Sequence, residues 1–496
     1  MFLLSFVRII RMNTKTIIFF ISICALFYSC MEEKVDPDYK GYPHEIGAII
    51  TTKCAIKGCH DEVSKSACGG LCLESWNKMF EGYKGGATTI PYRSDFSTLF
   101  FSCNVYSDLG ITLTPTMPYN KANLSREEII TIRNWIDQGA ADEKGVVKFS
   151  DNPYRSKLYV SHLLCDEVAV FDYETLLPMR YISVGKLNQT EYTKMISVSP
   201  DGNYCYAVFI ITGVIQKFRT SDDSFVSELN LGLGAWWSFA ITSDSKKAFC
   251  INYDTPGGIQ YIDLETMTSL SSYNNNNNFK YLFGVAINNS STFLYVAPQF
   301  GNYIYKINIS DPANLTTQEI TLDGTVTPIL TSSLDPYSIS FSPDETKYYV
   351  TCVHSNEVRV MQTSNDSLLK TISLSSYPQQ ISFSKTTPYF FVSCPDDSIS
   401  FPGLVGSVSV INQDDLTLVK RIYTGFNPYG MAVDDTRKMV YVTNMNTSSN
   451  GLMSHHTGTC GGKNGYITFI DLNTLSLIPD KKIEVSVSPY SISIRK

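Results

Sequence analysis

Short runs of alternating apolar and polar residues recur from about residue 157 to the C-terminus. The run at residues 196–199 alternates strictly and is followed by Pro200, Asp201 and Gly202. Alternation with a period of two predicts a β-strand with one buried face, and Pro, Asp and Gly predict the turn after it. Equivalent runs return at intervals of about 40 to 55 residues, a spacing typical of repeat architectures; they begin at Ile196, Phe239, Val285, Ile339, Ile381 and Met431.

Three further strands are predicted after each of these runs. In one repeat they include residues 349–351, which are rich in aromatics, 358–361 and 369–374. Four short strands per repeat is the pattern of a β-propeller blade. Besides the complete repeats, a partial one at residues 157–184 lacks its first strand, and an isolated strand stands at residues 490–494. We therefore predict that the last strand completes the first blade, which makes an all-β propeller of seven blades.

The tetrapeptide Tyr441, Val442, Thr443 and Asn444 lies in one of the predicted second strands. Together with the Ser-Pro-Asp-Gly turn, it resembles the YVTN family of propeller repeats. The resemblance covers residues 153–496 and implies a seven-bladed propeller that acts as a binding or scaffold module. Propellers carry many unrelated activities, so this resemblance does not identify a ligand.

The chain ahead of the propeller does not follow the repeat. Apolar positions within residues 45–51 have the spacing of a short helix. A second helix is predicted to begin after Ser125, which forms a capping box with Glu128, and to end near Gln138. These elements predict a small all-α domain at residues 42–140, joined to the propeller by a linker at residues 141–152.

The predicted domain carries a pair of cysteines followed directly by a histidine: Cys54, Cys59 and His60. A c-type haem is held by two cysteine thioethers and by the histidine after the second cysteine, which binds the iron. Four residues separate the cysteines here instead of the usual two, and Gly58 can supply the bend that this spacing needs. Two prolines flank Met117 in an extended loop, which makes its sulfur a candidate for the second axial ligand.

The order of these elements, ending in the Trp-Ile-Asp-Gln-Gly-Ala pattern at residues 135–140, resembles class I cytochrome c. It is most similar to cytochrome-like modules of planctomycetes and Bacteroidetes. The resemblance implies one haem c attached covalently at Cys54 and Cys59, with His60 and Met117 as axial ligands. The competing interpretation is a Cys54–Cys59 disulfide with Met117 in the core.

The other cysteines also need an account. A disulfide from Cys103 to either Cys68 or Cys72 fits an exported protein, and the sequence leaves its pairing open. The cysteines of the propeller lie mostly within apolar strand patterns and are expected to be buried free thiols; they are Cys165, Cys205, Cys250, Cys352, Cys394 and Cys460. An insertion at residues 446–465 also brings His455, His456 and Cys460 together, either as ligands of a metal or in a solvent-exposed rim loop.

The N-terminus predicts export from the cytoplasm. Three basic residues precede a short apolar run at residues 17–28, so residues 1–29 form a predicted signal peptide. The residues ending at Cys30 resemble a lipobox, which implies acylation of Cys30 and a tether at residues 30–41. Glu32 and Glu33 resemble the export tag of Bacteroidetes surface lipoproteins. We expect attachment to the outer membrane or cell surface, on either its outer or its periplasmic face.

Composition and charge exclude some classes of function. The 496 residues carry a net charge of −7, and basic residues do not cluster, which argues against nucleic-acid binding. The first hypothesis is an extracytoplasmic electron carrier whose propeller binds a redox partner protein or another ligand. The alternative is a non-redox surface-binding lipoprotein with disulfide-bonded N-terminal cysteines. No acid–base pair or nucleophile motif recurs across the predicted blades, so a carrier or binding module is favoured over an enzyme.

Overall fold

The computed structural model describes residues 37–187, 189–324, 333–454 and 460–496. The predicted signal peptide and Cys30 lie outside these residues. Residues 40–496 form one compact unit. Among the described residues, no helix has the length and apolar character needed to cross a membrane.

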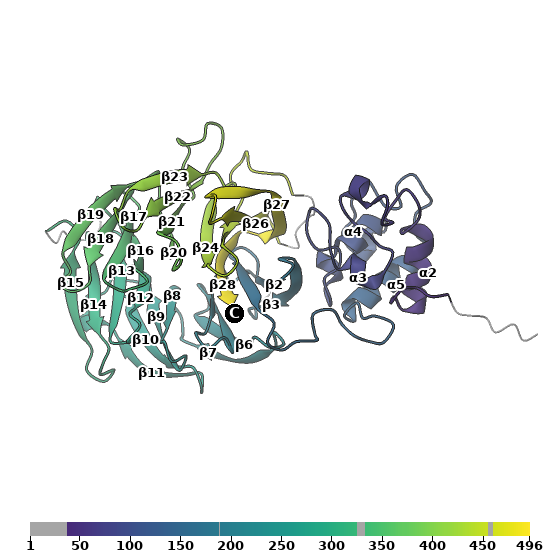
Figure 1. Cartoon of the computed structure of the whole chain (residues 1–496). Helices are drawn as coiled ribbons and strands as arrows, with labels where there is room; N and C mark the ends of the chain where they lie inside the picture. The colour runs from purple at the N-terminus through teal and green to yellow at the C-terminus, as the bar shows by residue number, and fades with distance from the viewer. Residues whose placement is uncertain (1–36, 188, 325–332, 455–459) are drawn as a thin grey trace, which may run out of the picture. The chain divides into compact units, whose positions relative to one another are not determined.

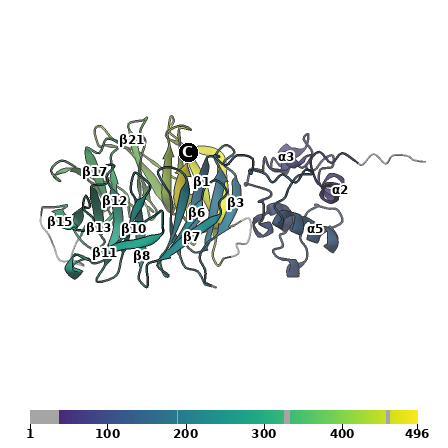
Figure 2. The ribbon, with the colours of Figure 1, turned by 90° about the horizontal axis from the view of Figure 1, so that it is seen from below.

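Seven antiparallel four-stranded sheets make up most of this unit, and each sheet is one blade. Figure 1 shows them following one another in chain order, and Figure 2 shows the strands of neighbouring blades standing side by side. Blade 1 contains β28 (Pro489–Arg495), β1 (Lys157–His162), β2 (Glu167–Asp172) and β3 (Pro178–Ser183). Blade 2 contains β4 (Thr193–Val198), β5 (Tyr204–Phe209), β6 (Val214–Arg219) and β7 (Phe225–Asn230). The predicted seven-bladed propeller is confirmed.

The other five blades repeat this arrangement, with the first strand of each blade innermost. Blade 3 contains β8 (Trp236–Ile241), β9 (Lys247–Asn252), β10 (Gly258–Asp263) and β11 (Thr268–Tyr273), and blade 4 contains β12 (Leu282–Ile287), β13 (Phe293–Pro298), β14 (Tyr303–Asn308) and β15 (Thr316–Thr321). Blade 5 contains β16 (Pro336–Phe341), β17 (Lys347–Cys352), β18 (Glu357–Gln362) and β19 (Leu368–Ser373). Blade 6 contains β20 (Ile381–Phe383), β21 (Tyr389–Cys394), β22 (Ser407–Asn412) and β23 (Leu418–Ile422), and blade 7 contains β24 (Pro428–Asp434), β25 (Met439–Asn444), β26 (Asn464–Asp471) and β27 (Ser476–Val487). A short 3-10 helix, η4 (Asn275–Asn277), lies between blades 3 and 4.

Burial follows from the stacking of the blades. The second strand of a blade is covered on both faces, as in β17, whereas the fourth strand is mostly exposed, as in β11. Aromatic side chains of the second strands pack between blades: Tyr349 of blade 5 joins one hydrophobic cluster with Phe390 of blade 6. Because a single blade cannot bury both faces alone, each blade needs its neighbours. This explains why the second strands are the aromatic ones.

Ring closure occurs as the sequence predicts. Strand β28 pairs antiparallel with β1, with Leu158 opposite Ile494. The Arg495 guanidinium then reaches blade 2, where it donates to the carbonyl oxygens of Gly202 and Thr220 at 3.1 Å each. The last strand therefore completes blade 1 and also contacts blade 2.

The insertion between β25 and β26 is held by a disulfide from Cys460 to Cys165, in the turn between β1 and β2. The expectation that Cys165 and Cys460 are free thiols is therefore wrong. Because its sulfur is used in the bond, Cys460 is also not available as the metal ligand that one of the two interpretations of the insertion gave it. His455 and His456 lie outside the described residues. Sequence patterns missed this pairing because the two cysteines are 295 residues apart and meet only when blades 7 and 1 become neighbours.

Replacing Cys460 by Ser is expected to lower the free energy of unfolding by about 2–4 kcal/mol, since the cross-link restricts the unfolded chain over a long loop. Urea denaturation of the variant and of the wild type, each with and without a reductant, measures the difference. The reductant should destabilise the wild type to the level of the variant and leave the variant unchanged. A wild type that is insensitive to reductant would contradict the bond.

Residues 40–156, called here the N-terminal segment, contain four α-helices separated by 3-10 helices and irregular chain. The α-helices are α2 (His44–Lys53), α3 (Trp76–Met79), α4 (Thr98–Cys103) and α5 (Arg126–Asp137). The 3-10 helices are η1 (Lys65–Cys68), η2 (Ser94–Phe96) and η3 (Ser107–Leu109). The Ser125–Glu128 capping box of α5 is present as predicted.

The prediction of a small all-α cytochrome c-like domain is wrong. Between α2 and α5 the only α-helices have 4 and 6 residues, and turns, loops and an isolated β-bridge from Tyr83 to Gly86 fill the rest. Glycines with left-handed backbone, among them Gly69, Gly70 and Gly82, and several prolines interrupt helical structure there. The two predicted helices are present, but the prediction that the whole domain is helical is wrong.

The N-terminal segment is joined to blade 1 by an ion pair between the half-buried Arg93 and the buried Glu167. The Arg93 guanidinium makes two parallel hydrogen bonds of 2.9 Å to the Glu167 carboxylate at the start of β2. Next to this pair, the rings of Phe96 and Tyr181 stack with centroids 4.0 Å apart. Ile90 of the segment belongs to the same hydrophobic cluster as strands of blades 1 and 7. The segment and the propeller therefore share one hydrophobic cluster.

Replacing Arg93 by Met is expected to destabilise the protein by about 3–5 kcal/mol, because it leaves the carboxylate of Glu167 buried without its cation. Chemical denaturation measures the loss. The double variant Arg93→Met with Glu167→Met should recover part of it, since no unpaired charge then stays buried. The ion-pair explanation fails if Glu167→Met lowers the free energy of unfolding as much in the Arg93→Met background as it does in the wild type, because the two side chains then act independently.

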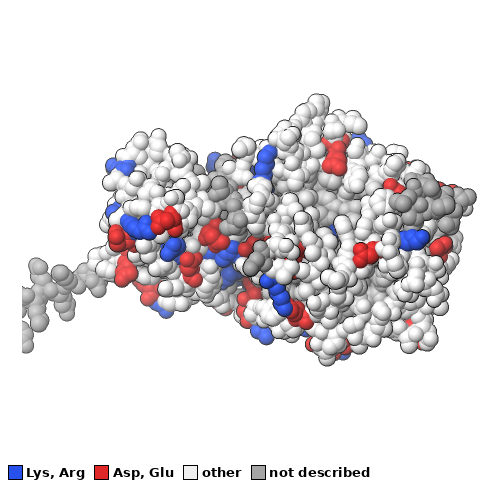
Figure 3. Space-filling model, turned by 180° about the vertical axis from the view of Figure 1, so that it is seen from behind, with Lys and Arg blue, Asp and Glu red and all other residues white. Residues whose placement is uncertain are grey.

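Charged side chains of both signs lie on the face of the molecule seen in Figure 3. Figure 3 shows positive and negative side chains interspersed among uncharged ones on the face that it presents. This distribution agrees with the modest net charge of −7.

Candidate cofactor site

A cavity of about 640 Å³ lies within the N-terminal segment, and all four predicted haem ligands line it: Cys54, Cys59, His60 and Met117. The rest of its wall is mostly apolar and includes Leu71, Leu73, Leu99, Pro115, Pro118 and Tyr119. The volume is within the range of ordinary cofactor and ligand sites. Residues more than fifty positions apart in the sequence thus meet around one space.

The two cysteines and the histidine are placed by a tight turn at the end of α2. The amide of Cys54 still bonds to the Ile50 carbonyl oxygen at 2.9 Å, so the helix delivers this thiol to the cavity wall. The chain then reverses through Gly58, whose φ of +87° is left-handed, and the His60 amide returns to the Cys54 carbonyl at 3.2 Å. The predicted bend at Gly58 is therefore present, and any other residue there would be strained.

The His60 side chain is oriented by a backbone carbonyl. Its Nδ1 lies 3.4 Å from the carbonyl oxygen of Leu71, which makes Nε2 the nitrogen suited to a metal bond. Burial lowers the pKa of His60 below its usual value, and this effect outweighs the opposing one of the Leu71 carbonyl. The imidazole is therefore neutral at pH 7, as a metal ligand requires.

Met117 reaches the cavity on a loop that α4 holds in place. The Met117 amide donates to the carbonyl oxygen of Ser102 at 2.6 Å, and the Thr116 hydroxyl donates to the Leu113 carbonyl at 3.2 Å. Helix α4 itself contributes Leu99 and Cys103 to the cavity. The proline-flanked loop is thus attached to an element that is part of the same site.

Cys68 and Cys103 line the cavity as well, which sequence reasoning missed. Every cysteine of the N-terminal segment is a free thiol, so the predicted disulfide from Cys103 to Cys68 or Cys72 is wrong, and a Cys54–Cys59 bond is also absent among the described residues. Burial raises the pKa of Cys54 to about 12 and that of Cys103 still further. These thiols are protonated at neutral pH.

The cavity cysteines do not form a metal cluster. Within the described ranges, the one group of three potential ligands whose atoms lie close together is Glu62, Cys72 and Glu74. Both glutamates of that group pair with Lys78, at 2.7 and 3.4 Å, and Glu62 also pairs with Lys65 at 2.5 Å. The charges of that group are thus neutralised by lysines.

The residues of the large cavity fit a c-type haem. The site offers two thiols on one turn, an oriented neutral imidazole and a thioether, which are the donors that such a haem takes. The apolar side chains around them exclude water from a flat, largely apolar group. A small metal ion would leave most of the 640 Å³ unfilled.

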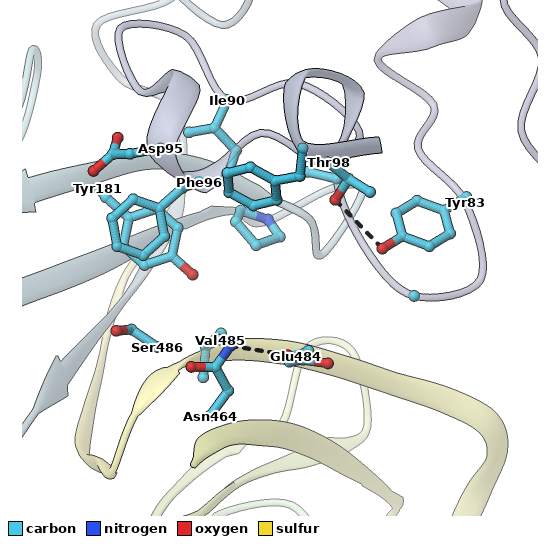
Figure 4. Close-up of a pocket in the computed structure, with 14 residues that line it drawn as sticks. Tyr83, Ile90, Asp95, Phe96, Thr98, Tyr181, Asn464, Glu484, Val485 and Ser486 are labelled. Carbon is cyan, nitrogen blue, oxygen red and sulfur yellow. Dashed lines mark hydrogen bonds between the residues drawn. The ribbon is translucent and has the colours of Figure 1, made fainter. Parts of the chain in front are cut away.

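One wall of this cavity faces the propeller through Tyr83 and Thr98, whose hydroxyl oxygens lie 3.5 Å apart. The same two residues line a second, smaller cavity of about 40 Å³, together with Phe96, Tyr181 and Glu484. Figure 4 shows this smaller cavity between the N-terminal segment and strands of blades 1 and 7. Two residues of the wall thus connect the candidate site to the ring.

Comparison with known proteins supports the fold but identifies no function. No protein-family model and no curated protein matches the chain. Among solved structures, a functionally unknown protein from Desulfotomaculum acetoxidans DSM 771 is similar, with 16% sequence identity and a TM-score of 0.51 over 68% of this chain and 98% of that chain. Kuenenia stuttgartiensis hydrazine synthase aligns with 17% identity and a TM-score of 0.48 over 62% of this chain and 93% of that chain. At such identities, the first similarity supports the propeller fold alone.

Proposed function

We propose that this chain is an exported c-type haem protein that transfers electrons, with the propeller as the scaffold that holds the haem segment and binds a partner. The observation that carries the proposal is the single cavity lined by Cys54, Cys59, His60 and Met117. A bound haem would supply one-electron transfer at the iron.

Each of the four residues has a role on this proposal. Cys54 and Cys59 would hold the haem covalently, and His60 Nε2 and the Met117 sulfur would be its axial ligands. The Leu71 carbonyl keeps the His60 ring in the required tautomer. A methionine opposite a histidine raises the reduction potential relative to two nitrogen ligands, so a comparatively high potential is expected.

The location of the protein also belongs to the proposal. Export by a signal peptide, acylation of Cys30 and attachment to the outer membrane or cell surface rest on the N-terminal sequence. The Cys165–Cys460 disulfide supports an extracytoplasmic compartment, because such bonds persist in oxidising environments. The tetrapeptide at residues 441–444 lies in the buried strand β25, and it supports assignment of the blades to the YVTN type.

The propeller suits the role of a scaffold because several side-chain contacts join it to the N-terminal segment. The Arg93–Glu167 ion pair and the Phe96–Tyr181 stack fix that segment against blade 1. A redox partner that binds the ring would therefore meet the haem at a defined position. The identity of that partner is open.

The test is an absorption spectrum of the full-length protein, produced in a bacterial strain that attaches c-type haem. We expect a Soret band, sharpened visible bands on reduction, and haem staining that survives denaturing electrophoresis. A colourless protein from such a strain overturns the proposal and favours the non-redox surface-binding alternative. Haem that is lost on denaturation contradicts covalent attachment. In that case, only the assignment of His60 and Met117 as axial ligands remains.

A further inference from the structure

The centre of the propeller contains a second candidate site, which is independent of the proposed haem. Each blade places one side chain in the same layer of the central channel, called here the channel layer: Tyr490, Lys194, Trp237, Phe283, Tyr337, Gln379 and Tyr429, in the order of blades 1 to 7. In six of the seven blades the pairing register of the innermost strand shifts at this position, as at Lys194 and Trp237. Such a bulge redirects a side chain, here toward the channel.

The channel layer lines a cavity of about 270 Å³, and three of its polar atoms have no hydrogen-bond partner in the described part of the chain. They are Lys194 Nζ, Trp237 Nε1 and Gln379 Oε1. Lys194 is 5% exposed and Gln379 is 2% exposed. A buried polar atom without a partner costs free energy, so three of them around one cavity make it a candidate site for a ligand that supplies those partners.

Lys194 has the most unusual environment of the three. Its Nζ lies 3.4 Å from the ring centroid of Trp237 and 3.9 Å from that of Phe283, and no Asp or Glu is among the residues that line the cavity. Burial lowers the pKa of its amine well below the usual range. An anion in the cavity would supply the charge partner that the protein does not provide.

The hydroxyl groups of the three tyrosines, by contrast, form hydrogen bonds with one another. The Tyr337 and Tyr429 hydroxyls are hydrogen-bonded, and the Tyr490 hydroxyl donates to that of Tyr429 at 2.7 Å. The Tyr429 and Tyr490 rings lie 4.1 Å apart, and those of Phe283 and Tyr337 lie 4.0 Å apart. Aromatic rings therefore form most of the wall, and a flat, apolar ring can pack against them.

The order of the blades indicates where the polar groups of a ligand would lie in the channel. The two unpaired donors, Lys194 and Trp237, come from blades 2 and 3, and the unpaired acceptor, Gln379, comes from blade 6. In a closed ring of seven, blade 6 lies across the channel from blades 2 and 3. A matching ligand has an anionic group at one end, a hydrogen-bond donor at the other and a flat ring between.

We propose that the propeller channel binds a small aromatic carboxylate with a hydroxyl group at the opposite end of the ring. Its carboxylate accepts hydrogen bonds from Lys194 and Trp237, and its hydroxyl donates to Gln379 Oε1. The aromatic side chains of the channel layer pack against its ring. This site does not depend on the proposed haem function, and either proposal can fail without the other.

Calorimetric titration of the full-length protein with 4-hydroxybenzoate tests the proposal, with quenching of tryptophan fluorescence as a second signal. The neutral 4-hydroxybenzamide has the same shape and should bind at least about tenfold more weakly, because it lacks the charge that Lys194 requires. Benzoate lacks the hydroxyl group, so its affinity should be about three- to tenfold lower than that of 4-hydroxybenzoate. An amide that binds as tightly as the carboxylate, or no binding of 4-hydroxybenzoate at millimolar concentration, overturns the proposal.

Two substitutions separate binding from folding. Lys194→Met should weaken 4-hydroxybenzoate binding at least about tenfold without lowering the melting temperature, because it removes a buried amine that has no hydrogen-bond partner in the described part of the chain. Lys217 is the matched control: it is also 5% exposed, but its Nζ donates to the Leu264 carbonyl at 2.6 Å and does not line the cavity. Lys217→Met should lower the melting temperature and leave affinity unchanged. Unchanged affinity in Lys194→Met refutes the site.

Discussion

Replacing both Cys54 and Cys59 by serine is expected to yield a folded protein without covalently bound haem. Serine differs from cysteine by one atom, but its hydroxyl cannot form the thioether that holds a c-type haem. Both thiols lie on the turn that leads from α2 to His60, and both line the 640 Å³ cavity. On the proposed function, their loss removes the attachment and leaves His60 and Met117, the proposed axial ligands, in place.

Haem staining after denaturing electrophoresis and the mass of the intact protein measure this effect. The matched control is the double variant Cys68→Ser with Cys103→Ser, because these thiols line the same cavity but lie outside the Cys-Cys-His turn. The control should keep its covalent haem. If the control loses the haem and the Cys54–Cys59 variant retains it, the attachment residues are assigned incorrectly.

Removal of the last eight residues is expected to have the largest effect on stability, because it deletes β28 and opens the ring. Ile492 is buried in the cluster between blades 7 and 1, and Ile494 packs against the same cluster. Truncation of one such buried side chain to alanine typically costs about 2–5 kcal/mol. Loss of the whole strand, with the Arg495 contacts to blade 2, approaches the entire stability of about 5–15 kcal/mol that a domain possesses.

Far-UV circular dichroism on heating and the yield of soluble protein measure the truncation. Ile492→Ala provides the graded version of the same experiment and should cost about 2–5 kcal/mol. Leu369→Ala is its control, since Leu369 lies exposed on the outer strand β19 and should change stability by less than about 0.5 kcal/mol. A truncated chain with the thermal stability of the wild type would show that β28 does not close the ring.

The candidate haem site was predictable because its donors are specified by local chemistry. Cys54, Cys59 and His60 lie on one turn, and Met117 is identified by the prolines beside it. The fold around them was not predictable in the same way. Helical periodicity was visible only at α2 and α5, and the intervening chain adopts turns that glycine and proline permit and that tertiary contacts select.

The channel layer shows the opposite case. Six of its seven residues stand two positions before an apolar residue that begins a repeat, as Lys194 stands before Ile196 and Gln379 before Ile381. The period was visible, and five of the seven residues at that position are aromatic. Lys194 and Gln379 break this pattern, so the repeats alone do not show that these two residues belong to one site. Their shared role appears only when the seven strands surround one cavity.

The sequence by itself determined the strands, the number of blades and the closing strand, because alternation and turn residues act over a few neighbouring positions. Its short motifs also pointed to four residues that line one cavity. The tertiary structure alone decided that the segment ahead of the ring is not an all-α domain and that Cys165 meets Cys460. It also decided that Lys194, Trp237 and Gln379 share a cavity. The physical reason is that these contacts join residues far apart in the chain, and only packing of the blades into a closed ring brings them together.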